Sequence, residues 1–219
     1  MKKTIEINPV FTIEQGEFYS SEYNDFENSI HSVTVKIHND GTPENIGYAE
    51  MKIMNRAIIR HSNATEIMAA DAYSDKVYEY SVRLFNAYGG IKENIAEQLG
   101  IWFTEELYDI AFVMRIVIYP KFRGHGILRD LFQFMRFHMG QTMLYVGEPF
   151  PLQYEDMKYR EENDGLNIFS KEPKRFKNAK NKIRRHYINN GLISIPSAKG
   201  LLFLFSANEP NQILDNPEM

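Results

Sequence analysis

One stretch of the chain, Leu107–Tyr119, limits the possible folds more than any other. Its two predicted faces carry Ile110, Phe112, Met114, Ile116 and Ile118 on one side and Ala111, Val113, Arg115 and Val117 on the other. A strand that is apolar on both faces lies in the middle of a sheet that is covered on both sides. We therefore expect a layered α/β or α+β protein in which this strand is central and ends at Pro120.

Strands and helices alternate along the rest of the chain. Turn residues and the alternation of polar and apolar side chains predict strands at 32–39, 46–54, 142–147, 192–195 and 200–206. Helical spacing predicts helices at 64–73, from Ser74 onward, at 91–99, 126–139 and 176–190. Asn63 and Ser74 are the expected N-caps of the first two helices, and Gly191 is placed to end the last one. This order predicts a mixed sheet flanked by helices.

The length of 219 residues favours one domain over 1–219, with a core at about 33–206, an insertion at about 153–175 and a tail at about 207–219. No apolar stretch approaches the roughly 20 residues that a membrane helix needs, and no signal sequence is readable. We therefore expect a cytoplasmic protein that does not bind membranes.

Composition excludes several kinds of site. The chain has no cysteine, which rules out disulfides, thiolate zinc sites, iron–sulfur clusters and a cysteine nucleophile. Its six histidines show no metal-ligand spacing, so we expect no metal. The net charge of −4 argues against a dedicated nucleic-acid binder.

The segment Arg123-Gly124-His125-Gly126 links the central strand to the following helix. Glycines allow a ligand to approach the backbone closely, and the free N–H groups of a helix's first turn suit a phosphate or pyrophosphate. Arg123 adds a cation that can bind the same anion at two points. The segment is neither a Walker A loop nor a GxGxxG motif. It predicts an anion site unless it is an ordinary strand-to-helix turn.

The segment also resembles the acyl-CoA loop of the GNAT superfamily of acyl-CoA-dependent N-acyltransferases. That loop reads [Gln/Arg]-x-x-Gly-x-[Gly/Ala] after a strand ending in a hydrophobic residue, any residue and proline. Arg123, Gly126 and Ile118-Tyr119-Pro120 match the pattern. A late helix of the family ends in Tyr-x-x-x-Gly-Phe, which stands here as Tyr187 to Leu192.

The resemblance implies a twisted, largely antiparallel, GNAT-like sheet whose central strand pair splays apart. Acetyl-CoA, or another acyl-CoA, would bind as co-substrate in the cleft between strands 107–119 and 142–147. Backbone groups near Ile116, Val117 and Ile118 would orient the pantetheine and hold the oxyanion. The pyrophosphate would lie on Arg123, Gly124, His125, Gly126, Ile127 and Leu128.

The resemblance also implies direct transfer of an acetyl group to an amine, with Tyr187 as the proton donor to the departing thiolate. Tyr187 also fits the alternative role of a core tyrosine, because it lies on the apolar stripe of its helix. The base that deprotonates the amine is open among Glu50, Asp71 and Glu105. The acceptor is a small-molecule or peptide amine, with cationic acceptors mildly favoured by the net acidity. A homodimer is one state that we consider.

Two departures from the family pattern favour a different function. Leu128 stands where the family has Gly or Ala, and Leu192 where it has Phe. They favour a GNAT-fold protein that binds CoA as a regulatory module without turnover. Leu128 either narrows the cofactor groove or packs into the core, since it continues the apolar stripe of its helix.

A third function rests on the basic stretch Lys171–His186, which holds eight Lys or Arg residues against one acid. Such a stretch is compatible with nucleic-acid binding. We expect instead a solvated helix face beside an anionic cofactor, because no aromatic stacking platform is visible in this stretch.

Overall fold

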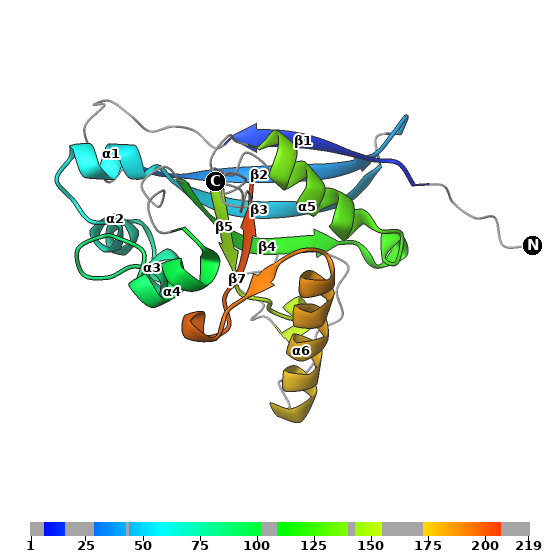
Figure 1. The fold of residues 1–219 in the computed structure, drawn as a ribbon. Helices are drawn as coiled ribbons and strands as arrows, with labels where there is room; N and C mark the ends of the chain where they lie inside the picture. The colour runs from blue at the N-terminus through cyan, green and yellow to red at the C-terminus, as the bar shows by residue number, and fades with distance from the viewer. Residues whose placement is uncertain are drawn as a thin grey trace, which may run out of the picture.

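The computed structural model describes residues 7–15, 29–42, 44–101, 109–139, 143–154 and 173–206. Seven strands form one sheet in the order β1-β2-β3-β4-β5-β7-β6 (Figure 1). The strands are β1 (Pro9–Gln15), β2 (Ile30–Asn39), β3 (Asn45–Met54), β4 (Asp109–Ile118), β5 (Met143–Gly147), β6 (Ile193–Ser194) and β7 (Leu202–Phe205). Only β4 and β5 pair in parallel within these described strands. The predicted class, α/β with a mixed and largely antiparallel sheet, is confirmed.

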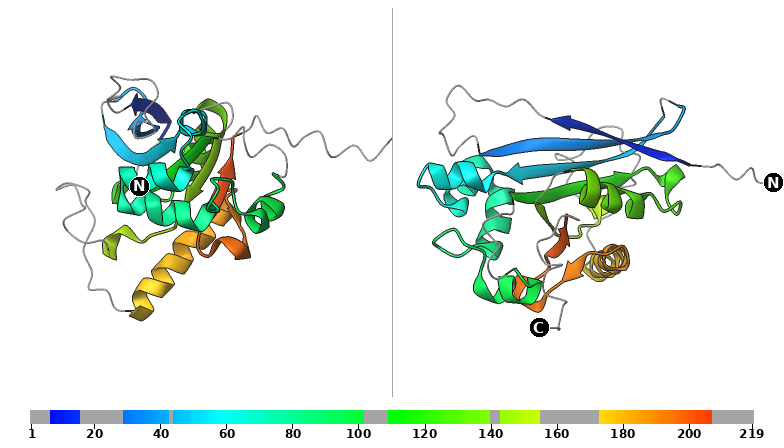
Figure 2. Two further views of the ribbon diagram at one scale, coloured as in Figure 1. Left: turned by 90° about the vertical axis from the view of Figure 1, so that its left-hand side faces the viewer. Right: turned by 45° about the horizontal axis from the view of Figure 1, so that its top comes forward.

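Helices cover both faces of this sheet (Figure 2). They are α1 (Arg56–His61), α2 (Glu66–Tyr73), α3 (Asp75–Leu84), α4 (Glu93–Leu99), α5 (Ile127–His138) and α6 (Pro173–Asn189). Residues of α1 to α4 form one apolar cluster with Ile110 and Phe112 of β4. Residues of α5 form a second cluster with Ala111 on the opposite face. The central strand is therefore covered on both sides, as its sequence predicts.

Two elements at the start of the chain were not predicted. β1 pairs with β2 along its whole length, so the sheet extends well before residue 33, where we had placed the start of the core. Helix α1 forms because Asn55 accepts a hydrogen bond from the backbone N–H of Ile58 and caps it. The next helix begins at Glu66 with Thr65 as its cap, and not at residue 64 with Asn63. Asn63 instead adopts a left-handed turn with φ of 53°.

A β-bulge in the middle of β4 changes which residues share a face. Arg115 pairs with Glu50 of β3 and Val113 with the next residue, so Met114 is an extra residue without a β3 partner. Beyond it, Ile116 and Ile118 pack on the α5 side with Val113. The prediction that Ile116 and Ile118 share a face with Ile110 and Phe112 is therefore wrong.

The other predicted elements are found with small shifts at their ends. The β2–β3 hairpin, the Ser74 cap of α3, the start of α5 after Gly126 and the end of α6 before Gly191 are confirmed. The first turn of α6 occupies residues 173–175, which we had assigned to the insertion. The remainder of that insertion, over 155–172, and the tail at 207–219 lie outside the described residues.

Candidate functional site

The site is a cleft that opens where β5 leaves β4. The two strands pair from Asp109 and Met143 to Val113 and Gly147. Beyond this point β4 continues to Ile118, paired only with β3 among the described strands. Its other edge therefore presents backbone N–H and C=O groups toward the cleft, and the bulge at Met114 lies at the point of divergence.

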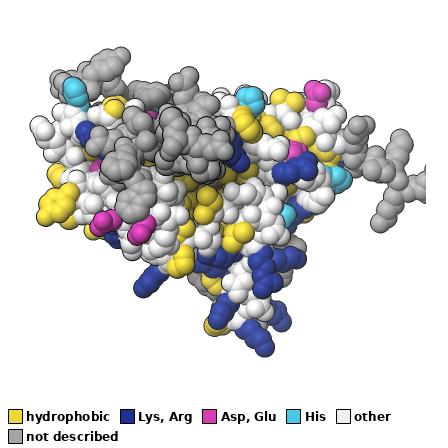
Figure 3. Space-filling view, in the orientation of Figure 1, with side chains coloured by type: hydrophobic (Ala, Val, Ile, Leu, Met, Phe, Trp, Pro, Cys, Tyr) yellow, Lys and Arg dark blue, Asp and Glu magenta, His cyan; other side chains and the backbone are white. Residues whose placement is uncertain are grey.

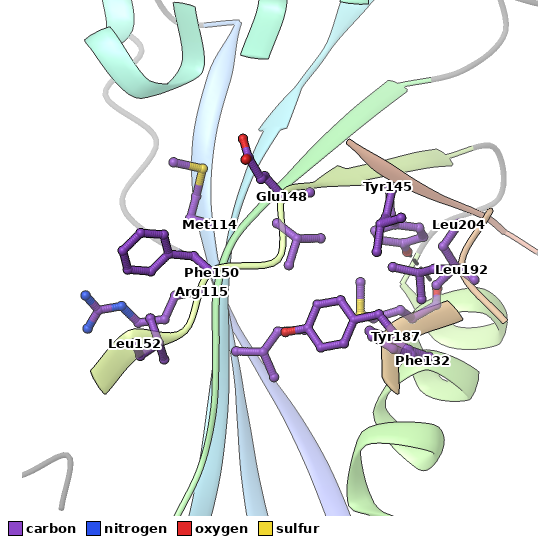
Figure 4. Close-up of a pocket in the computed structure, with 15 residues that line it drawn as sticks. Met114, Arg115, Phe132, Tyr145, Glu148, Phe150, Leu152, Tyr187, Leu192 and Leu204 are labelled. Carbon is purple, nitrogen blue, oxygen red and sulfur yellow. Dashed lines mark hydrogen bonds between the residues drawn. The ribbon is translucent and has the colours of Figure 1, made fainter. Parts of the chain in front are cut away.

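Side chains of β4, α5, α6 and β7, and of the segment that follows β5, line this cleft (Figure 4). They include Met114 and Ile116 of β4, Phe132 of α5, Glu148 after β5, Tyr187 of α6 and Leu204 of β7. The free space within it is about 30 Å³. That is room for roughly two water molecules, so a larger ligand needs side chains at the opening to move.

Tyr187 reaches across the cleft toward β4 (Figure 4). It lies in the last turn of α6, and its ring packs edge-on against Phe132 with 5.4 Å between the ring centroids. Within the described part of the chain its hydroxyl has no hydrogen-bond partner. Burial, reinforced by the nearby Tyr80, raises the pKa of Tyr187 above its usual value of 10.0. The phenol is therefore protonated at neutral pH and can donate its proton.

The predicted anion site lies at the turn where β4 gives way to α5. Gly124 and Gly126 adopt φ of 87° and 80°, a left-handed conformation that favours glycine. No described residue accepts a hydrogen bond from the backbone N–H groups of residues 124–128. These groups, together with the positive end of the α5 dipole, can bind a phosphate group.

Side chains of the turn divide into exposed and buried sets. Arg123 is exposed, and its Nε donates to the carbonyl oxygen of Ile118 at 2.9 Å, which holds its guanidinium beside the turn. His125 is also exposed. Ile127 and Leu128 are buried in the α5 cluster, so they can offer a ligand only their backbone N–H groups.

The side chains of the predicted pantetheine-binding segment, residues 116–118, alternate between the two faces of β4. Ile116 lines the cleft. The side chain of Val117 is 1% exposed and lies on the opposite face beside Tyr48 of β3. Ile118 contributes the carbonyl oxygen that binds Arg123.

Glu148 is a cleft residue that no sequence motif indicated. Arg83 of α3 donates to its carboxylate at 2.7 Å, and Lys180 of α6 donates to the other oxygen. Burial opposes ionisation of Glu148, but the hydrogen bonds from Lys180 and Arg83 outweigh it and lower its pKa below 4.5. Its backbone N–H donates to the phenol oxygen of Tyr80, whose pKa burial raises to about 12.

The three candidate bases lie in different places. Glu50 on β3 is 39% exposed and lies 3.8 Å from Arg115, which lines the cleft on the other side of β4 from Tyr187 (Figure 4). Asp71 is exposed on α2 and does not line the cleft. Glu105 lies outside the described residues. The structure therefore brings one of the three, Glu50, next to a residue of the cleft.

Two further searches of the described ranges bear on ligands and membranes. No group of three or more His, Asp or Glu side chains there is arranged to hold a metal ion. No helix there is both long and apolar enough to cross a membrane.

Comparison with known proteins adds no relative. No protein-family model, no curated protein and no solved structure matches the chain significantly. The function is therefore inferred from the cleft, the turn and the residues that they contain.

Proposed function

We propose that the protein is an acyl-CoA-dependent N-acyltransferase that transfers an acetyl group from acetyl-CoA to an amine. The observation that carries the proposal is the continuity of β4. The same strand has an edge along the cleft with which no described strand pairs, and it ends at a turn whose N–H groups have no acceptor among the described residues. A thioester with a long amide-containing arm and a pyrophosphate matches both parts, as the resemblance to the GNAT superfamily implies.

The edge of β4 from Met114 to Ile118 supports binding of the pantetheine arm. An extended ligand with amide groups can add to such an edge by main-chain hydrogen bonds, in the way that a peptide extends a sheet. The pyrophosphate would then lie on the N–H groups of residues 124–128, with Arg123 as an additional charged donor.

The reaction we propose is direct. The neutral amine attacks the thioester carbonyl carbon, and a C–N bond forms as the oxygen gains negative charge, which a backbone N–H near Ile116 stabilises. The C–S bond then breaks, Tyr187 gives its proton to the leaving thiolate, and the amine loses its extra proton to a base. Tyr187 afterwards recovers a proton from solvent. Glu50 is the base we propose, because it lies beside Arg115 at the opposite side of β4 from Tyr187.

One observation favours the alternative of a CoA-binding regulatory module. The free space within the cleft is only about 30 Å³, and Leu192 contributes to its lining. Leu128, the other departure from the GNAT pattern, supports that alternative less, because it is 6% exposed and packs in the α5 cluster.

Calorimetric titration with CoA and acetyl-CoA tests the donor site. Arg123→Ala should weaken binding about 10- to 100-fold, the scale of a lost charged hydrogen bond. Lys121→Ala is the matched control, because Lys121 is an exposed cation close by that pairs with Glu44 at 2.7 Å. No CoA binding by the wild-type protein, or equal losses in both variants, would exclude the proposed site.

Release of free thiol from acetyl-CoA with a panel of amines tests the transfer. Turnover with at least one amine supports the acyltransferase. Tight CoA binding without turnover on any amine supports the regulatory module instead.

A further inference from the structure

Helix α6 concentrates positive charge in a chain that is acidic as a whole. The helix has no acidic residue, whereas the whole chain has a net charge of −4. Its Lys and Arg residues are Lys174, Arg175, Lys177, Lys180, Lys182, Arg184 and Arg185. Figure 3 shows these basic side chains gathered over the helix where it projects from the body of the molecule.

Two of these cations fasten the helix to the protein. Lys180 pairs with Glu148, and Arg184 donates to Ser194 and to the carbonyl oxygen of Gly200. Both are half-buried, whereas Lys174, Lys177, Lys182 and Arg185 are exposed. The attachment of α6 through Lys180 and Arg184 therefore does not account for these four.

An aromatic cluster adjoins the first turns of α6. Phe176 of the helix packs edge-on against Phe150 and Tyr154, with 5.6 Å between ring centroids in each pair. The ring of Phe150 is 36% exposed. Phe150 and Tyr154 come from the segment after β5, which is why the basic stretch alone did not reveal an aromatic platform.

We propose that these four exposed cations and the three-ring cluster form a binding surface for single-stranded nucleic acid. Exposed cations at Lys174, Lys177, Lys182 and Arg185 span about 16 Å of helix at 1.5 Å per residue. That length matches a run of phosphates, whereas one small anion contacts one or two cations. Non-specific single-strand binding combines such a charged track with aromatic rings on which bases stack.

Other polyanions fit these observations less well. A duplex keeps its bases stacked on one another, so it cannot use the aromatic cluster. An anionic membrane attracts helices that have an apolar face available for insertion, but Ala179, Ile183 and Tyr187 of α6 are half-buried toward the protein. An acidic protein matches the charge but offers no bases to the rings. The inference does not depend on the proposed acyltransferase activity.

Fluorescence anisotropy with labelled 20-nucleotide single strands of RNA and DNA tests the surface. Lys174→Gln, Lys177→Gln and Lys182→Gln combined should weaken binding at least tenfold. The combined variant should also reduce the slope of log K against log salt by about two, since each phosphate contact contributes roughly 0.7 on a single strand.

A charge variant elsewhere on the surface, a variant of one aromatic ring and a stability measurement complete the experiment. Lys36→Gln, Arg60→Gln and Lys76→Gln combined remove three surface cations elsewhere and should leave affinity unchanged. Phe150→Leu should weaken single-strand binding severalfold without altering the salt slope, because it removes stacking and no charge. Thermal melting of each variant verifies that the fold is retained.

Several outcomes would overturn the proposal. These are no single-strand binding by the wild type at about 50 mM salt, equal losses in the two charge variants, or equal binding of the matched duplex. Equal affinity for polyglutamate would indicate an acidic protein partner, and equal affinity for vesicles of anionic lipid would indicate a membrane surface. Tighter binding of single strands than of these three competitors, with losses confined to the α6 and Phe150 variants, supports it.

Discussion

The packing and the proposed chemistry of Tyr187 reside in different parts of its side chain. The ring packs against Phe132, whereas the hydroxyl has no partner in the described part of the chain. Because its pKa is raised, this phenol stays protonated through the pH range in which an amine acceptor becomes neutral. Removing the oxygen alone can therefore separate a catalytic role from a structural one.

Tyr187→Phe should keep the folded structure and the affinity for CoA, because the ring remains and no hydrogen bond to a described residue is lost. Turnover should fall on the order of 10²-fold, the usual effect of losing a general acid. Thermal melts and steady-state rates on one preparation provide the comparison. A variant with wild-type rates and lowered stability would make Tyr187 a core tyrosine only.

Glu148 predicts a pH-dependent contribution to stability. Its pKa in the folded protein is lowered, so its ion pairs stabilise the fold above about pH 4.5 and this stabilisation is lost as the pH falls through the folded pKa. Glu148→Gln should lower stability by about 2 kcal/mol at pH 7, the scale of charged hydrogen bonds. The melting temperatures of Glu148→Gln and the wild type should converge as the pH falls below 4.5 toward 3.

Glu79→Gln is the matched control for that experiment. Glu79 is 52% exposed and pairs with Lys76 on the surface of α3, where an ion pair contributes little. Its melting temperature should follow that of the wild type at every pH. A constant difference between Glu148→Gln and the wild type down to pH 3 would contradict the role assigned to the carboxylate.

At the scale of single residues, helix starts were predictable and the bulge was not. The Ser74 cap of α3 and the start of α5 after Gly126 follow from local residue types. The extra residue at Met114 does not, because a run that is apolar on both faces alternates equally well in either register. The same ambiguity led to the wrong face for Ile116 and Ile118.

At the scale of elements, α5 joins the proposed anion site to the core. The N–H groups of Ile127 and Leu128 have no acceptor among the described residues, while the side chains of both residues are buried. Leu128, which departs from the GNAT pattern, therefore contributes its side chain to core packing.

Leu128→Ala should cost about 2–4 kcal/mol of unfolding free energy, as expected for a large-to-small change in a packed cluster. Its affinity for CoA should equal that of the wild type at temperatures where both are folded. Leu131→Ala, a fully buried position one turn along α5, serves as the control and should behave alike. Tighter CoA binding by the Leu128 variant alone would show that the leucine obstructs the ligand.

Long periodic elements were predictable, and short or edge elements were not. The β2–β3 hairpin and α5 have a clear period, Ser74 starts α3 by accepting a hydrogen bond from the N–H of Val77, and Gly126 directly precedes α5. Helix α1 has only six residues, too few to establish a helical period. β1 is an edge strand with exposed residues on both faces, so its apolar pattern is weak.

At the scale of the whole molecule, a buried ion pair holds together the helical layer on one face of the sheet. Arg56 is 1% exposed, and its Nε donates to Glu66 at 2.7 Å. The backbone N–H of Arg56 donates to Asp109 at the start of β4, and its guanidinium lies over the ring of Phe85. The side chain of Arg56 thus joins α1, α2 and the end of α3, while its backbone links α1 to the central strand.

Arg56→Ala should destabilise the protein by about 3–5 kcal/mol, because it leaves the carboxylate of Glu66 buried without its partner. Replacing both residues, as Arg56→Met with Glu66→Leu, should recover much of that loss. Chemical denaturation of the three proteins measures the two effects. If Arg56→Ala lowers the free energy of unfolding by less than about 1 kcal/mol, the Arg56–Glu66 pair does not hold the helical layer together.

The candidate site was predictable only where it is local in sequence. The turn and Tyr187 could be found because each belongs to a short motif. Glu148 and Leu204 could not, since they line one cleft only after β5 pairs with both β4 and β7 and α6 packs beside them. That arrangement depends on long-range pairing, for which no local residue pattern exists.

The strand order β5-β7-β6 has a consequence for how the protein is made. β5 lies between β4 and β7, and β7 follows α6 in the chain. During translation the turn at Gly126 can form early, but β5 keeps an open edge and an incomplete cleft until β7 has left the ribosome. An unpaired edge of this kind is prone to pair with other chains. Ribosomes that stop between α6 and β7 would therefore release a product that aggregates, and the proposed ligand site would be complete only once β7 has formed.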